Sequence, residues 1–133
     1  MKIQIVFPRT QTALTYWTVG EVLGATANFG GQRWHDPIGD EIDLAIFVTG
    51  PVGGGQPNLA PIRAALRAGL NVFIVTGSDV TISPDDLGSW RKGRVYFFHT
   101  GRAVAGDGFI PFSDLGTAIL RLQSGSSLDG LGA

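Results

Sequence analysis

Five consecutive apolar residues, Leu44-Ala45-Ile46-Phe47-Val48, stand near the middle of the chain, and a second apolar run follows at residues 72–75. A strand with one face in water alternates apolar and polar residues, whereas a strand covered on both faces can be apolar throughout. Residues 58–68, between the two runs, have apolar side chains at helical spacing and are followed by Gly69, a typical residue at a helix end. A strand, a helix and a second buried strand in succession predict a parallel sheet covered by helices.

The rest of the chain continues this alternation of strands and helices. We expect further strands at residues 3–7, 32–35 and 95–98, and further helices at residues 11–27, from Ser83 onward, and at residues 113–123. In the first of these helices the expected apolar stripe consists of Leu14, Trp17, Val22 and Leu23. These elements predict an α/β fold, a three-layer sandwich with about five mainly parallel strands. Such a sheet is flavodoxin-like or Rossmann-like, and 2-1-3-4-5 is its simplest strand order.

Composition narrows the class of protein. The chain has 133 residues, and we expect one domain at residues 1–123 followed by a flexible Gly/Ser-rich tail at residues 124–133. Because cysteine is absent, a disulfide scaffold and a thiolate metal site are excluded. A formal net charge of -1 disfavours non-specific nucleic-acid binding. No apolar run has the length of a membrane span and the first residues do not resemble a signal peptide, so we expect a cytoplasmic protein without membrane contact.

Ligands of such sheets bind beyond the carboxyl ends of the strands, at the point where the winding of the chain reverses. This rule points to the glycine-rich loop at residues 49–58, which follows a predicted strand and precedes a predicted helix. Its backbone N–H groups are suited to an anion such as phosphate. Its spacing is neither that of a P-loop nor G-x-G-x-x-G, and the alternative is a loop without a ligand.

Aromatic, charged and histidine side chains supply further candidates. Trp34 is suited to base stacking with a polar contact from Asp36, and the alternative is a tryptophan at the core edge beside a surface pair of His35 and Asp36. Arg63, one helical turn before Arg67, suits either an anion-binding rim or a solvated helix face. Two histidines are too few for a zinc site, so we expect no metal. The predicted ligand-binding residues are Phe7, Arg9, Tyr16, Trp34, Asp36, Gly50, Gly53, Gly54, Gly55, Asn58, Arg63 and His99.

Four segments occur in a recognisable order along the chain. They are residues 3–8 before a helix with Tyr16 and Trp17, residues 42–48 leading through Gly50-Pro51 to a helix, residues 65–75, and Phe112-Ser113-Asp114-Leu115. Over residues 1–123 this order resembles the nucleoside 2-deoxyribosyltransferase-like group of small Rossmann-like nucleotide-handling proteins. The resemblance implies a Rossmann-like fold with a pocket for a nucleotide or a related molecule.

The chain departs from that group at the nucleophile. The group has a nucleophilic glutamate in the helix after the glycine-rich loop, about eight residues before the glycine that ends the helix. Here Pro61 stands at that place, and no glutamate lies between Gln56 and Gly69. Proline offers no carboxylate, so the resemblance implies a pocket that binds its ligand without glycosyl transfer.

Three functions remain open from the sequence. The first, which we favour, is non-catalytic binding of a nucleotide or a nucleotide-derived small molecule, for sequestration or sensing, by a homo-oligomer without a cofactor. The second is a nucleoside- or nucleotide-processing enzyme of the deoxyribosyltransferase-like class in which Asp36, His35 or His99 serves as acid or base. The third is an assembly protein without a ligand, whose exposed aromatic residues form subunit contacts.

Overall fold

The described parts of the chain contain both strands and helices. The computed structural model describes residues 3–6, 17–18, 20–22, 42–49, 59–76, 95–99 and 109–128. Within these ranges the strands are β1 (Ile3–Val6), β2 (Leu44–Thr49), β3 (Asn71–Thr76), β4 (Val95–His99) and β5 (Phe109–Pro111). The helices are α2 (Ala60–Arg67), the 3-10 helix η2 (Phe112–Asp114) and α3 (Leu115–Gln123). Residues 17, 18 and 20–22 are also helical and are called the first helical segment below.

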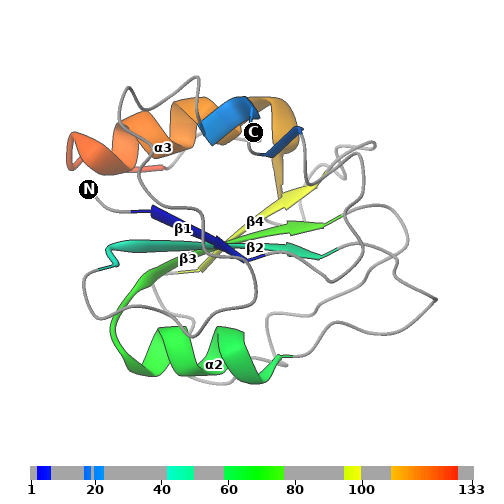
Figure 1. The fold of residues 1–133 in the computed structure, drawn as a ribbon. Coiled ribbons are helices and arrows are strands. Elements are labelled where there is room, and N and C mark those ends of the chain that lie inside the picture. Colours follow the sequence, from blue (N-terminus) through cyan, green and yellow to red (C-terminus); the bar gives the residue numbers. More distant parts are fainter. Residues whose placement is uncertain are drawn as a thin grey trace.

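The five described strands form one sheet in the order β1-β2-β3-β4-β5, and every neighbouring pair is parallel (Figure 1). The parallel α/β sheet predicted from the two apolar runs is therefore confirmed. Four of the expected strands are described, and they neighbour one another in the expected order. The strand expected at residues 32–35 and the helix expected from Ser83 lie outside the described residues. The sequence does not predict β5.

The strands divide their side chains between two cores, because successive residues of a strand point to opposite faces. On one face Ile46 and Phe73 pack in a core that includes residues of the first helical segment and of α3. On the other face Phe47 and Ile74 pack in a core with residues of α2. Figure 1 shows α2 and α3 on opposite sides of the sheet. This double cover explains why residues 44–48 carry no polar side chain.

Helix α2 ends where the sequence predicts. Gly69 has a φ of 84°, in the left-handed region that favours glycine. Its N–H donates to the carbonyl oxygen of Leu66 at 3.1 Å, and the N–H of Leu70 donates to that of Ala65 at 3.2 Å. These two bonds form the Schellman motif, which satisfies carbonyl groups left over at a helix end. The role predicted for Gly69 is confirmed.

Helix α3 ends in the same motif, and the chain then returns to the core. Gly125 has a φ of 74°, its N–H donates to Leu122 O at 3.2 Å, and the N–H of Ser126 donates to Arg121 O at 2.8 Å. Leu128 is 6% exposed and belongs to the core on the α3 face. Residues 124–127 are exposed, and Leu128 after them places an apolar side chain on the sheet. The flexible tail expected at residues 124–133 stays a prediction. Residues 129–133 lie outside the described part of the chain.

The first helical segment presents a different side to the core than its sequence predicts. Thr18 and Val22, four residues apart, are both fully buried, so they define the inward stripe. Trp17, which the sequence places in an apolar stripe facing the core, is 57% exposed instead. One helical residue corresponds to a rotation of about 100°, so a buried Thr18 turns its neighbour toward solvent. Leu14 and Leu23 lie outside the described residues.

Candidate functional site

The described helices that follow β1 and β2 lie on opposite faces of the sheet. The first helical segment follows β1, and its Val22 belongs to the core on the α3 face. Helix α2 follows β2, and its Ile62 and Leu66 belong to the core on the other face. Neighbouring parallel strands whose connections diverge in this way form a topological switch point, where ligands bind beyond the carboxyl ends of the strands. The carboxyl ends of β1 and β2 are therefore the candidate site.

Three neighbouring strands end on polar residues at this end of the sheet. Thr49 of β2 pairs in register with Thr76 of β3, which pairs in register with His99 of β4. Together with Val6, the last residue of β1, these residues define what we call the carboxyl edge. The residues that directly precede them, 44–48 in β2, 72–75 in β3 and 97–98 in β4, are apolar and buried.

Thr76 holds two strands together at the carboxyl edge. Its side chain is 1% exposed, and its hydroxyl donates a hydrogen bond to the carbonyl oxygen of Phe98 at 3.3 Å. A buried hydroxyl that lacks a partner costs free energy, so this bond is what permits a polar residue at this depth. The rule that ligands bind beyond the carboxyl ends of strands includes Thr76 as the start of residues 76–79, but its residue type does not signal that the side chain is buried.

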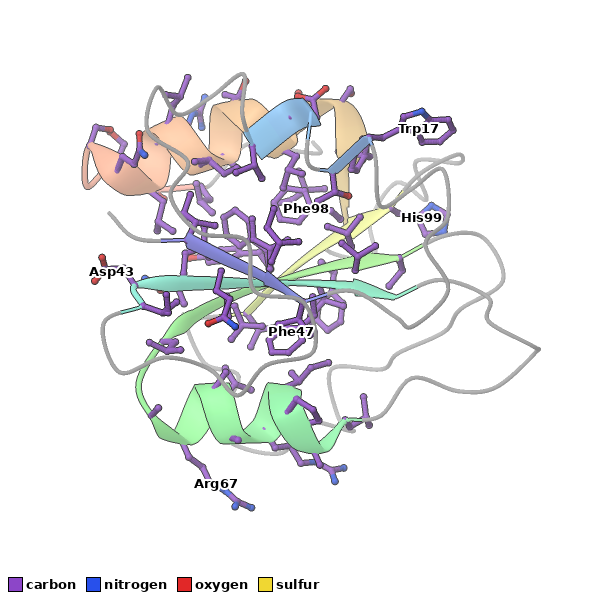
Figure 2. All side chains as sticks on the ribbon, in the orientation of Figure 1. Trp17, Asp43, Phe47, Arg67, Phe98 and His99 are labelled. Atoms are coloured by element: carbon purple, nitrogen blue, oxygen red, sulfur yellow. The ribbon has the colours of Figure 1, made fainter. Side chains whose placement is uncertain are left out.

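His99 is the predicted site residue that the structure places at the carboxyl edge. It is the last residue of β4, it is half-buried, and its Nδ1 atom is buried. Figure 2 shows its side chain at the end of the molecule toward which β2, β3 and β4 point. It lies two positions after Phe97, which packs in the α2 core, so His99 is on the α2 face of the sheet. An imidazole can donate and accept hydrogen bonds and can transfer a proton.

Arg63, the other predicted site residue that is described, lies on the exposed surface of α2. The backbone N–H of Arg63 donates to the carbonyl oxygen of Leu59 at 2.9 Å, so Arg63 lies in the first part of the helix. Arg67, one turn later, is also exposed and points away from the sheet in Figure 2. An exposed position suits an anion-binding rim as well as a solvated helix face, so both alternatives stay open for Arg63 and Arg67. The predicted site residues outside the described part are Phe7, Arg9, Tyr16, Trp34, Asp36, Gly50, Gly53, Gly54, Gly55 and Asn58.

A buried polar residue near the candidate site escaped the sequence analysis. Gln4 of β1 is 1% exposed and pairs in register with Ala45 of β2. It lies two residues before Val6, so its Cα is roughly 7 Å from the end of the strand. One polar residue in an apolar strand looks like ordinary alternation with a solvated face, which is why its burial gives no signal in the sequence.

Other kinds of site find no support in the described part of the chain. Its histidine and acidic residues include no group of three or more that could hold a metal ion. None of its helices has the length and apolar character needed to cross a membrane. No protein-family model, no curated protein and no solved structure matches this chain, so the candidate site rests on the geometry described above.

Proposed function

We propose that the chain binds a nucleotide or a nucleotide-derived small molecule at the carboxyl ends of β1 and β2 and holds it without turnover. The observation that carries this proposal is the divergence of the first helical segment and α2 to opposite faces after neighbouring strands. In doubly wound sheets of the flavodoxin and Rossmann type, this divergence accompanies the ligand crevice. Because such folds host many functions, the choice of a nucleotide rests on the resemblance in the order of elements to the deoxyribosyltransferase-like group.

The charges near the carboxyl edge support an anionic ligand. None of Val6, Thr49, Thr76 and His99 is acidic, and the first turn of α2 has no acidic residue. The exposed Asp43 precedes β2 and therefore lies at the opposite end of the sheet. Since α2 connects two parallel strands, its N-terminal end lies on the side of the carboxyl edge, where the helix dipole favours negative charge. Within the carboxyl edge and the first turn of α2 a phosphate group would meet no repelling carboxylate; the other described acids are Glu21, in the first helical segment, and Asp114, after β5.

The sequence of α2 supports binding without glycosyl transfer. Pro61, which stands in place of the glutamate of the resembled group, lies in the first turn of α2 and is exposed. The whole helix, Ala60–Arg67, contains no carboxylate. A covalent glycosyl intermediate needs an activated carboxylate or an equivalent nucleophile, and α2 supplies none.

The proposal is tested first with the protein as purified from cells. Native mass spectrometry should find a retained nucleotide, and calorimetry should give a dissociation constant below 1 mM, roughly −4 kcal/mol or stronger, for at least one of AMP, ATP, cyclic AMP and ADP-ribose. His99→Gln at the carboxyl edge should weaken that binding, whereas Asp43→Asn at the opposite end should not. Absence of binding below millimolar concentration, or equal effects of the two substitutions, would refute the proposed site.

A second candidate function, subunit assembly, has one observation in its favour. Trp17 and Leu120, both in the helical layer on the α3 side of the sheet, are 57% and 51% exposed. Large exposed apolar side chains are common in surfaces that contact another protein. Light scattering tests this surface, because an assembly role predicts that Trp17→Ala and Leu120→Ala each lower the molar mass in solution, and calorimetry with nucleotides tests binding separately.

A further inference from the structure

The indole of Trp17 stands out among the described side chains because it is both large and exposed. A tryptophan can bury 150–250 Å² of surface, and burial of that area is favourable. Among the described residues only Leu120 is a comparably exposed large apolar side chain. What Trp17 and Leu120 can contact depends on where each side chain lies in the fold.

Trp17 is presented by a segment that is firmly packed. The next residue, Thr18, and Val22 one turn later are fully buried, so the backbone of the first helical segment is anchored in the core. The exposure of Trp17 therefore follows from the phase of the helix rather than from fraying. An aromatic side chain on an anchored helix loses little conformational freedom when a ligand binds, which makes it effective in recognition.

The position of Trp17 relates it to the candidate site. The first helical segment follows β1, so the chain reaches it from the carboxyl end of that strand. Figure 2 shows the indole at the same end of the molecule as His99, toward which the strands point. Trp17 belongs to the layer on the α3 face, while His99 lies on the α2 face. A ligand beyond the ends of β1 and β2 would therefore have the Trp17 layer on one side and the α2 layer on the other.

We propose that the indole of Trp17 stacks on the base of the bound nucleotide, and this assignment rests on the proposed function. An indole offers a flat apolar surface and one N–H donor, so it recognises a planar aromatic ring by its face rather than by a hydrogen-bond pattern. Stacking of this kind tolerates different bases, because every base has a π-face. The ligand class is then a purine or pyrimidine nucleotide, bound with little discrimination by Trp17 among bases.

The test compares two probes and three variants by calorimetry. AMP has a base and ribose 5-phosphate has none, so stacking contributes only to the first. Trp17→Ala and Trp17→Leu should weaken AMP binding by about tenfold or more, while Trp17→Phe keeps a ring and should lose less. Both the wild type and the variants should bind ribose 5-phosphate alike. Leu120→Ala removes the other exposed apolar side chain and is the matched control, with unchanged affinity for AMP.

The outcomes separate this inference from the proposed function. If the wild type binds neither probe below millimolar concentration, the proposed function is overturned and the stacking role with it. If AMP binds but Trp17→Ala and Trp17→Leu leave its affinity unchanged, only the stacking role is overturned. The stacking role alone is also overturned if Trp17→Ala and Trp17→Leu weaken the binding of ribose 5-phosphate as much as the binding of AMP. It is likewise overturned if Trp17→Ala and Leu120→Ala both change the molar mass in solution. In either case Trp17 acts through the fold or through a subunit contact.

Discussion

Two glycine-to-alanine substitutions should change the stability of this protein in opposite directions. Gly125 closes α3 at a φ of 74°, and Gly20 lies in the first helical segment. A Cβ atom added at either position would meet no heavy atom within 4 Å. Steric contacts with the rest of the protein therefore do not enter, and only the conformation of the backbone distinguishes the two sites.

The expected magnitudes follow from that difference. At Gly125 an alanine must adopt the left-handed conformation, which costs about 1–2 kcal/mol for a residue with a Cβ, offset in part by the reduced entropy of the unfolded chain. We expect a net loss of about 1 kcal/mol in the free energy of unfolding. At Gly20 alanine has the higher helix propensity by about 0.8–1.0 kcal/mol, so we expect a gain of about 0.5–1 kcal/mol.

Urea unfolding followed by circular dichroism measures both changes. The midpoint should fall for Gly125→Ala and rise for Gly20→Ala, with the dependence on urea unchanged, because neither substitution alters the surface exposed on unfolding. Gly125→Asn is the control, since asparagine tolerates the left-handed region better and should lose less stability than alanine. A neutral or stabilising Gly125→Ala would refute the helix end described for α3, and shifts in the same direction would refute the contrast.

Two further predictions concern the cores. Leu128→Ala should lower the free energy of unfolding by about 2–5 kcal/mol, whereas Leu120→Ala, the same change at a side chain that is 51% exposed, should stay within about 0.5 kcal/mol; equal effects in urea unfolding would show that Leu128 does not dock. Ile74→Ala, at a fully buried position facing α2, should also cost about 2–5 kcal/mol. An Ile74→Ala variant that melts like the parent in calorimetry would contradict the two-sided cover of β3.

The central part of the fold could be predicted because its signals are local and strong. Residues 44–48 and 72–75 are apolar without interruption, and only burial on both faces makes such strands stable in water. Gly69 follows an amphipathic helix at the position where a left-handed residue is wanted, and its φ of 84° agrees. In these segments the residue types alone decide the conformation, so the sequence is sufficient.

The structure differs from the elements predicted from the sequence where tertiary contacts decide the conformation. Strand β5 has three residues and ends on Pro111, too short a segment for periodicity, and it forms through its pairing with β4. Leu128 follows a Gly/Ser-rich stretch, and its burial after the turn at Gly125 is a tertiary contact that the composition of the stretch does not signal. The phase of the first helical segment depends on the burial of Thr18, a polar residue that a hydrophobic pattern does not select.

The end of the sheet at which the candidate site lies could be predicted from the sequence, whereas most of its residues could not. That ligands of parallel sheets lie beyond the carboxyl ends is a general rule, and it selected His99 from the sequence. Which two strands form the switch point depends on the faces that the first helical segment and α2 cover, and a linear sequence does not contain this information. The burial of Gln4 and Thr76 could not be predicted for the same reason, because burial of a polar residue is a property of the assembled sheet.

Stability and recognition use different parts of the same strands. In β2 and β3 the residues 44–48 and 72–75 are buried apolar groups that fill the two cores, so their substitution acts on folding. At the carboxyl edge the hydroxyl of Thr76 is held by the carbonyl oxygen of Phe98 and serves the sheet itself. The groups beyond that bond, His99 in the sheet and Trp17 in the helical layer, can be altered without opening a core, because one is half-buried and the other mostly exposed. A loss of ligand affinity on substitution of these two residues, at unchanged stability, would therefore report on binding rather than on the fold.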